Sequence, residues 1–384
     1  MPKPLPLKSL IRLRPAEIES SAVLRKTANA SRKLAELKGL AASIPNQSIL
    51  INTLILQEAK DSSAIENIVT THDELFRGAT YPDLLASPAA KEVRDYVEAL
   101  RVGYSRVMAT GLLTTNHMLE IQAELERNDA GFRKQPGTAL KDGAGNLIYT
   151  PPQDPTEVID LMTDLERFLN DDSAFDADPL IKMAIAHHQF ESIHPFYDGN
   201  GRTGRIINVL YLVMTGLLDI PVLNLSRHIV RTKPDYYRLL QSVRESADAP
   251  EVWQEWVMYM LDAVEQTSGQ TIVTIADIKA ALTDYKHRIR AAFRFYSQDL
   301  ITNLFMHPYT RIEFVERDLK VSRITATKYL DGLSEAGFVA KAKVGRTNYY
   351  VNVALNSILT KPELVEGPQY SQRSKPTSRQ KCCA

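Results

Sequence analysis

A short polar segment, HPFYDGNGRTGR from His194 to Arg205, gathers side chains that suit phosphate chemistry. His194 can act as a general base, because an unperturbed imidazole has a pKa near about 6.5 and is largely neutral at cellular pH. Asp198 offers a hard carboxylate of the kind that holds Mg²⁺ against phosphates. Arg202 and Arg205 follow in the first turn of a predicted helix, where cations are unfavourable unless they face an anion. The segment therefore predicts a polyphosphate site with a base beside it.

The glycines of this segment allow a second interpretation, because Gly199, Gly201 and Gly204 spell the G-x-G-x-x-G pattern of dinucleotide-binding turns. That pattern requires a buried strand before it and a βαβ unit around it, whereas the preceding AIAHHQFESI predicts a helix. A P-loop is excluded too, since no Gly-Lys-Ser/Thr follows. A plain interhelical turn, with arginines paired to surface carboxylates, is the remaining alternative. The combined order of histidine, aspartate, glycines and arginines favours nucleotide chemistry.

The elements that must position this segment are predominantly helical. Apolar residues at helical spacing predict helices at 16–44, 49–70, 91–107, 155–170, 179–193, 206–220 and 253–293. The two helices that flank the polar segment are almost continuously apolar, which is typical of buried helices. Residues 136–152 predict a hairpin instead, because a glycine-rich turn separates two short segments and two prolines follow.

The polar segment is a full match to the signature of the Fic family, His-x-Phe-x-Asp/Glu-Gly-Asn-Gly-Arg-x-x-Arg, and the chain resembles this family over residues 50–250. The resemblance implies a mainly α fold with a small β-hairpin flap. It also implies a nucleotidyltransferase, a protein adenylyltransferase that moves AMP from ATP to a Tyr, Thr or Ser hydroxyl of a target or of itself. His194 would take the hydroxyl proton, and Asp198 would hold Mg²⁺. The implied nucleotide-binding residues are Gly199, Asn200, Gly201, Arg202, Thr203, Gly204 and Arg205, the last at the γ-phosphate.

The same resemblance gives roles to two aromatic segments. The hairpin resembles the family's flap, which binds target backbone as an added strand, with Leu147, Ile148 and Tyr149 as its predicted edge. Tyr236 and Tyr237 resemble residues that close over the adenine and ribose. A plain surface hairpin and a pair of core aromatics are the respective alternatives.

A regulatory pattern precedes the core. The segment SSAIENI matches the family's inhibitory pattern Ser/Thr-x-x-x-Glu-Gly/Asn, with Ser62, Glu66 and Asn67 in the defined positions. Four-residue spacing puts Ser62 and Glu66 on one face of a helix. In the family this glutamate pairs with the second signature arginine, Arg205 here, and excludes the γ-phosphate, so the resemblance implies autoinhibition that is relieved by movement of an N-terminal helix. The alternative is that the glutamate orients a water that removes AMP from modified targets.

The C-terminal part predicts two amphipathic helices at 311–319 and 322–336, separated by a break at Lys320 and Val321, and then two strands around Gly345. This order resembles a winged helix-turn-helix domain. The residues that would face DNA are Ser322, Arg323, Thr325, Lys328, Lys341, Lys343 and Arg346. The excess of basic residues is small, so protein docking is the alternative for this domain. A DNA-binding regulator with a secondary Fic activity is the alternative for the chain.

Length and composition are those of an ordinary globular protein with two or three domains. The predicted domains are an N-terminal helical region at 1–110, a Fic core at 111–250, a helical connector at 251–300, a winged helix at 301–360 and a disordered tail at 361–384. The formal net charge of zero gives no global drive toward nucleic acid or anionic membrane. Both cysteines, Cys382 and Cys383, lie in the tail, so we expect no disulfide in the body and a reducing, cytoplasmic compartment. A homodimer is also consistent with the family.

Overall fold

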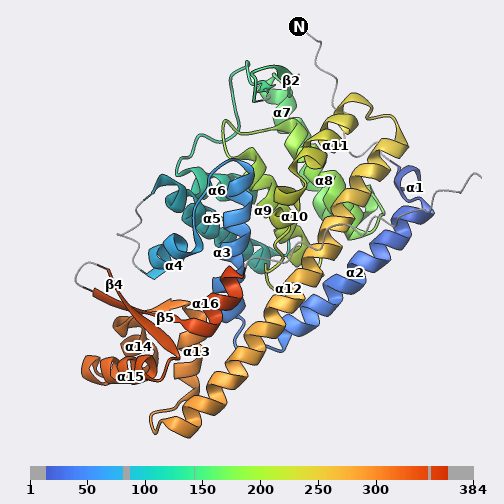
Figure 1. Cartoon of the computed structure of the whole chain (residues 1–384). Helices are drawn as coiled ribbons and strands as arrows, with labels where there is room; N and C mark the ends of the chain where they lie inside the picture. The colour runs from blue at the N-terminus through green and yellow to red at the C-terminus, as the bar shows by residue number, and fades with distance from the viewer. Residues whose placement is uncertain (1–13, 81–86, 142, 345–346, 362–384) are drawn as a thin grey trace, which may run out of the picture.

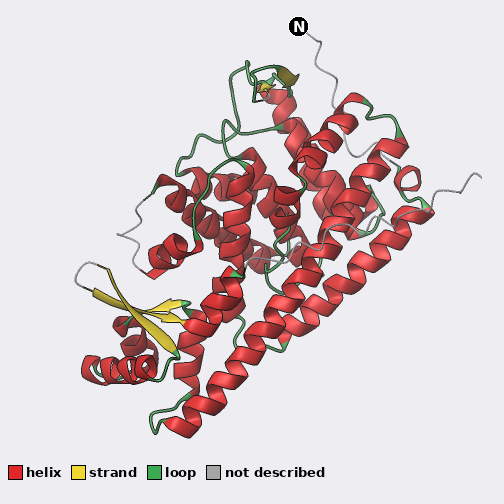
Figure 2. Ribbon diagram, in the orientation of Figure 1, coloured by secondary structure: helices red, strands yellow, loops and turns green. Residues whose placement is uncertain are grey.

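A computed structural model of the chain describes residues 14–80, 87–141, 143–344 and 347–361. The fold is mainly helical, as predicted, with two small β-sheets (Figures 1 and 2). The predicted tail beyond Lys361, with Cys382 and Cys383, lies outside the described residues, as do Gly345 and Arg346 of the predicted wing.

The N-terminal region contains α1 (Pro15–Ile18), α2 (Ser21–Ala42), α3 (Ser48–Ile65), α4 (His72–Thr80) and α5 (Pro88–Thr110). The predicted helix at 16–44 is therefore two helices, because Ser20 caps α2 by accepting a hydrogen bond from the Val23 N–H. The long α12 (Pro250–Ala292) runs beside α2 (Figure 1). Lys26 joins these two helices through ion pairs of 2.5 Å to Asp262 and 2.8 Å to Glu265.

The centre of the molecule is built from α8 (Pro179–Ile193) and α9 (Asn200–Met214), which pack against each other as expected for the two apolar helices. Every residue of α8 from Leu180 to Ile193 is buried. Around this pair lie α6 (Thr115–Glu126), α7 (Pro155–Asn170), a 3₁₀ turn at Asp172–Ala174, α10 (Ser226–Arg231) and α11 (Lys233–Glu245). Helix α12 closes the core, where the Trp256 indole N–H donates to the Ala184 carbonyl at 2.7 Å.

The predicted hairpin is present but short. Its strands β1 (Leu140–Lys141) and β2 (Leu147–Tyr149) pair antiparallel, with Leu140 opposite Tyr149. In Figure 1 the hairpin lies at one end of the molecule, above α7.

The C-terminal domain begins with α13 (Gln298–Met306) and β3 (Tyr309–Thr310) and continues with α14 (Ile312–Leu319) and α15 (Arg323–Glu335). Strands β4 (Val339–Val344) and β5 (Thr347–Asn352) follow, then α16 (Val353–Thr360), and the sheet order is β3-β5-β4. The two predicted helices and two predicted strands are thus present. Lys320 ends α14 in the left-handed conformation, and Ser322 caps α15, as the break between the two patterns predicted.

The C-terminal domain also contacts α3 of the N-terminal region. The Gln57 amide donates to the Leu359 carbonyl at 3.1 Å, and the Asn52 amide donates to the Met306 carbonyl at 3.5 Å. Among the described residues, no helix combines the length and the hydropathy that crossing a bilayer would require.

Candidate active site

The signature segment forms the turn between α8 and α9. His194 ends α8 in the left-handed conformation, with φ of 49°, and its N–H still donates to the Phe190 carbonyl at 3.0 Å. Phe196 is fully buried against Phe132 and Phe190, with ring centroids 5.3 and 6.2 Å away. Phe196 is therefore a packing anchor, and it fixes the turn that follows the histidine.

Asn200 braces the same turn. Its side-chain oxygen accepts from the Phe196 N–H and its amide donates to the Phe196 carbonyl, both at 2.9 Å. Both polar groups of the Asn200 side chain are thus bonded within the loop. This predicted nucleotide-binding residue therefore has only its backbone N–H, at the start of α9, to offer to a ligand.

Removal of this brace should destabilise the protein. In an Asn200→Ala variant the buried N–H and carbonyl of Phe196 lose their partners, so the free energy of unfolding is expected to fall by about 1–3 kcal/mol. Urea denaturation followed by circular dichroism measures the change. Asn128→Ala, at an exposed site, is the control and should leave the midpoint in place. An unchanged midpoint for Asn200→Ala would contradict the bracing role.

The three glycines of the segment lie where neighbouring side chains leave no room for a Cβ atom. A Cβ on Gly199, which has φ of 77°, would collide with the Glu126 carboxylate, and one on Gly201 would collide with the Glu66 carboxylate. Gly204 instead faces α8, where a Cβ would lie 2.7 Å from Glu191 Oε1. Gly204 therefore permits close helix packing, while Gly199 and Gly201 keep the loop face free of side chains.

Arg202 is 5% exposed and lies between two carboxylates. Its guanidinium donates to Glu92 of α5 at 2.9 Å and to Glu126 of α6 at 2.8 Å. Burial and nearby carboxylates outweigh Arg202 and raise the pKa of Glu126. No local pattern marks either carboxylate, because both come from helices distant in the chain. The neighbouring Thr203 is fully buried.

Arg205 lies deeper and is held by the predicted inhibitory residues. Its Nε donates to the Ser62 hydroxyl at 2.8 Å, and its second terminal nitrogen donates to Glu66 Oε1 at 2.9 Å and to the Ser62 carbonyl at 3.1 Å. Burial alone would raise the pKa of Glu66, but the charge and hydrogen bond of Arg205 outweigh it and the pKa is lowered. The ionised Glu66 carboxylate is therefore paired with the guanidinium of Arg205.

The end of α3 explains the residue after this glutamate. The helix stops at Ile65, five residues before the predicted end at 70, and Asn67 adopts the left-handed conformation with φ of 64°. The Asn67 N–H donates to the Ala64 carbonyl and the Ile68 N–H to the Ser63 carbonyl, which is the Schellman arrangement. This left-handed position favours Gly or Asn, so the pattern Glu-Gly/Asn encodes a helix end that presents the glutamate.

His194 lies beside two arginines, the buried Arg133 and the partly buried Arg244. Burial lowers its pKa to about 4, and the charges of Arg244 and Arg133 act in the same direction. The imidazole is thus neutral near pH 7, as a base requires. Asp198 is exposed in the loop, where its Oδ1 accepts from the Gly199 N–H at 2.7 Å.

Comparison with known proteins places the chain in a family. Models of the Fic/DOC family N-terminal region, the Fic/DOC family and the protein adenylyltransferase SoFic-like C-terminal domain match residues 24–105, 112–212 and 282–355. The chain belongs to the Fic/DOC family.

Curated relatives share only part of their length with this Fic chain. Protein adenylyltransferase fic-1 of Caenorhabditis elegans is 31% identical over 159 residues, which are 39% of this chain and 29% of that protein. Protein adenylyltransferase Fic of Aedes aegypti is 33% identical over 116 residues, or 30% and 21% of the two chains. The chain therefore covers less than a third of these relatives.

Solved structures support the Fic fold. A Fic family protein from Desulfovibrio desulfuricans aligns with a TM-score of 0.53 at 22% identity, over 86% of this chain and 96% of that one. A Fic domain containing signaling protein from Bacteroides thetaiotaomicron aligns with a TM-score of 0.52 at 16% identity, over 64% and 95%.

The two tyrosines of the Fic core differ in position. Tyr236 is buried, and its hydroxyl lies 2.9 Å from the His187 ring nitrogen, so it belongs to the core rather than to an open surface. Tyr237 is 45% exposed and packs edge-on against Tyr236. Burial and the nearby Glu66 raise the pKa of Tyr237 to about 12. Only Tyr237 is accessible to a nucleotide base.

The three predicted edge residues of the flap also divide. Leu147 and Ile148 are 39% and 44% exposed, whereas Tyr149 is buried. The Tyr149 hydroxyl donates to the Ser192 carbonyl of α8 at 3.1 Å. Tyr149 therefore anchors the flap beside His194, and Leu147 and Ile148 form its outer surface.

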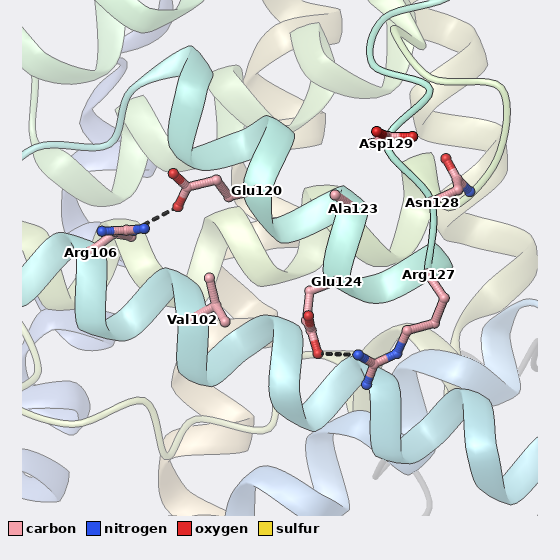
Figure 3. Close-up of a pocket in the computed structure, with 8 residues that line it drawn as sticks. All are labelled: Val102, Arg106, Glu120, Ala123, Glu124, Arg127, Asn128 and Asp129. Atoms are coloured by element: carbon pink, nitrogen blue, oxygen red, sulfur yellow. Dashed lines mark hydrogen bonds and ion pairs between the residues drawn. The ribbon is translucent and has the colours of Figure 1, made fainter.

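An open hollow between α5 and α6 lies apart from these residues (Figure 3). It is lined by Val102, Arg106, Glu120, Ala123, Glu124, Arg127, Asn128 and Asp129. Both arginines are paired, Arg106 with Glu120 at 2.6 Å and Arg127 with Glu124 at 2.5 Å. The lining thus carries two arginines against three carboxylates and offers no free cation for a polyphosphate, whereas Arg202 and Arg205 lie at the start of α9.

Proposed function

We propose that this chain is a protein adenylyltransferase that transfers AMP from ATP to a hydroxyl of a target protein or of itself. One arrangement supports this most. His194, whose imidazole is neutral near pH 7, lies before the turn between α8 and α9, and the guanidinium of Arg205 lies after it. In the reaction the target oxygen bonds to the α-phosphorus, and the bond from that phosphorus to the oxygen bridging to the β-phosphorus breaks. Pyrophosphate leaves, and the imidazole of His194 accepts the hydroxyl proton.

The phosphate chain would be held at the start of α9. The first N–H groups of this helix have no partners inside the helix, and Gly199 and Gly201 let the backbone approach phosphate oxygens closely. Arg205 would bind the γ-phosphate once Glu66 has left it. Arg202, which lies between Glu92 and Glu126, would add positive charge on the other side of the phosphate chain.

Asp198 would hold Mg²⁺. Its exposed carboxylate is a hard oxygen donor, and Mg²⁺ is commonly bound by one or two carboxylates together with substrate phosphates and water. No group of three potential metal ligands occurs among the described residues, so the protein's share of such a site would be small. The bound ion would neutralise charge on the α- and β-phosphates.

The Glu66 contact supports autoinhibition in cis. Glu66 occupies the guanidinium of Arg205 that a γ-phosphate would need, and it comes from the same chain. Removal of AMP by a water that Glu66 orients is a second use of the same contact and would be observed as loss of label from modified protein.

The proposal is tested with ATP radiolabelled at the α- or the γ-phosphate, added with Mg²⁺ to wild type and to Glu66→Gly. Addition of the chain is expected to increase labelling from the α-position alone, on the chain itself or on lysate proteins compared with lysate without the chain. A chain-dependent increase in labelling from the γ-position would indicate phosphoryl transfer and contradict the proposal. With no label from ATP, the same assay with other nucleoside triphosphates tests another donor.

The C-terminal domain gives less support to the alternative of a DNA-binding regulator. Two of the predicted DNA-facing cations are paired within the domain, Arg323 with Glu313 at 2.8 Å and Lys341 with Asp331 at 2.7 Å. Ion pairs of this kind offset the positive field that attracts phosphates. The enzyme is therefore the function that we favour, with protein targets bound through the flap.

A further inference from the structure

Two arginines, the buried Arg133 and the partly buried Arg244, converge on the end of α8, where the chain turns into His194. Arg133, in the loop before the flap, is 1% exposed. Its Nε donates to the His194 carbonyl at 2.8 Å and a terminal nitrogen donates to the Ile193 carbonyl at 3.2 Å. The same nitrogen donates to the carbonyl of Pro152, directly after the hairpin. Arg133 thus joins the histidine backbone to the base of the flap.

Arg244 reaches the same helix end from α11. Its guanidinium donates to the Glu191 carbonyl at 2.9 Å and to the Ser192 hydroxyl at 3.1 Å. The guanidinium also lies over the Tyr149 ring, 4.3 Å from the centroid, and Tyr149 donates to the Ser192 carbonyl. Arg244 is therefore a second connection between the end of α8 and the flap.

These contacts compensate for two unfavourable features of the turn after α8, its unpaired carbonyls and the left-handed conformation of His194. A helix leaves its last carbonyls without internal partners, and here those of Glu191, Ser192 and Ile193 all receive donors from outside the helix. A non-glycine residue in the left-handed conformation costs roughly 1–2 kcal/mol, so His194 needs such support to stay there. Cations at a helix C-terminus are also favourable to its dipole.

We propose that Arg133 and Arg244 are positioning residues for His194, which fix its backbone and align it with the flap that presents the target hydroxyl. This inference rests on the proposed transfer reaction. A forked guanidinium is required because each arginine bridges two or more acceptors at once, which the single ammonium of lysine cannot do in the same geometry.

The charges of the pair act on the imidazole as well. After burial, Arg244 and then Arg133 lower the pKa of His194, and Glu66 on α3 is the charged group that opposes them. A base works only when unprotonated, so transfer falls as the pH drops through the pKa of His194. Loss of either positive charge raises that pKa and moves the acid limb of the rate profile to higher pH.

The test compares Lys and Gln variants of Arg133 and Arg244 in a Glu66→Gly background. The Lys variants keep the charge and lose the fork, so kcat is expected to fall at least about tenfold, with KM for ATP nearly unchanged and the acid limb in place. The Gln variants should show the same loss and an acid limb at higher pH. The matched control is Arg238→Lys, an exposed arginine on the same helix α11, which should behave as the parent.

Two outcomes would overturn the positioning role. One is a kcat close to the parent value in both Lys variants, and the other is a change confined to KM for ATP. Circular dichroism melting identifies variants that fail to fold. If the Glu66→Gly parent itself shows no transfer, the proposed reaction fails rather than the positioning, and NMR titration of the His194 ring then tests the pair directly. The ring pKa should rise in the Gln variants, and an unshifted value would overturn the inference.

Discussion

Glu66→Gly is expected to raise the rate of AMP transfer roughly tenfold or more. A hydrogen bond between charged groups contributes about 1.5–3 kcal/mol, and each 1.4 kcal/mol is about a factor of ten in the equilibrium between blocked and free Arg205. The Glu66 side chain is 37% exposed, so solvent screening favours the lower end of that range. Initial rates of label transfer at limiting ATP measure the effect.

Matched variants separate the effect of the Glu66 charge from the effect of placing glycine at the end of α3. Glu66→Gln keeps the size of the side chain and removes its charge, so it should release part of the inhibition. Glu36→Gln, on the exposed face of α2, should leave the rate unchanged. A Glu66→Gly rate no higher than wild type would mean that Arg205 is already available to ATP, and the autoinhibitory role would be wrong.

His194→Ala should reduce transfer by about 10²–10⁴, because a positioned general base contributes that much to a proton transfer. The effect is best measured as kcat in the Glu66→Gly background, where the starting rate is high. ATP affinity should stay close to that of the parent, since Arg205 and the start of α9 are unaltered.

His287→Ala, an exposed histidine on α12, is the control for the loss of an imidazole. If His194→Ala kept the parental kcat, the base would have to be another group. If instead ATP affinity fell together with the rate, the histidine would be part of the nucleotide site.

The sequence alone predicted the elements that depend on local patterns. The continuous apolar runs on either side of the signature predicted two buried helices, and α8 and α9 are those helices. The capping residue Ser322 and the break at Lys320 were predictable for the same reason, since both depend on neighbours within a few residues. The match of SSAIENI predicted the contact between Glu66 and Arg205 only through resemblance to known proteins.

What the sequence did not predict are the partners that come from distant segments. Glu92 and Glu126 meet Arg202 only because α5 and α6 pack beside α9, and no local spacing marks them. Arg133 and Arg244 converge on one helix end from opposite sides of the signature. The inward position of Tyr149 was not predicted either, because strand alternation places Leu147 on the same face, yet Leu147 is exposed and only Tyr149 contacts Ser192 and Arg244.

The anchoring of α3 determines how Arg205 can be freed. Along its length this helix is held by buried hydrogen bonds from Gln57 to Leu359 and from the Ser226 N–H to Glu58, and Asp61 accepts from Asn224 at 2.7 Å. Sliding the whole helix would break all of these, at about 0.5–1.5 kcal/mol for each bond. Unwinding the last turn instead breaks the contacts of Glu66 and Ser62 with Arg205, those of Lys233 with the Ile65 carbonyl and Asn67, and the local bonds that end the helix, and it exposes Ile65. Under the proposed autoinhibition, activation is a local unfolding event, and its threshold is the stability of one helical turn rather than the docking of the N-terminal region.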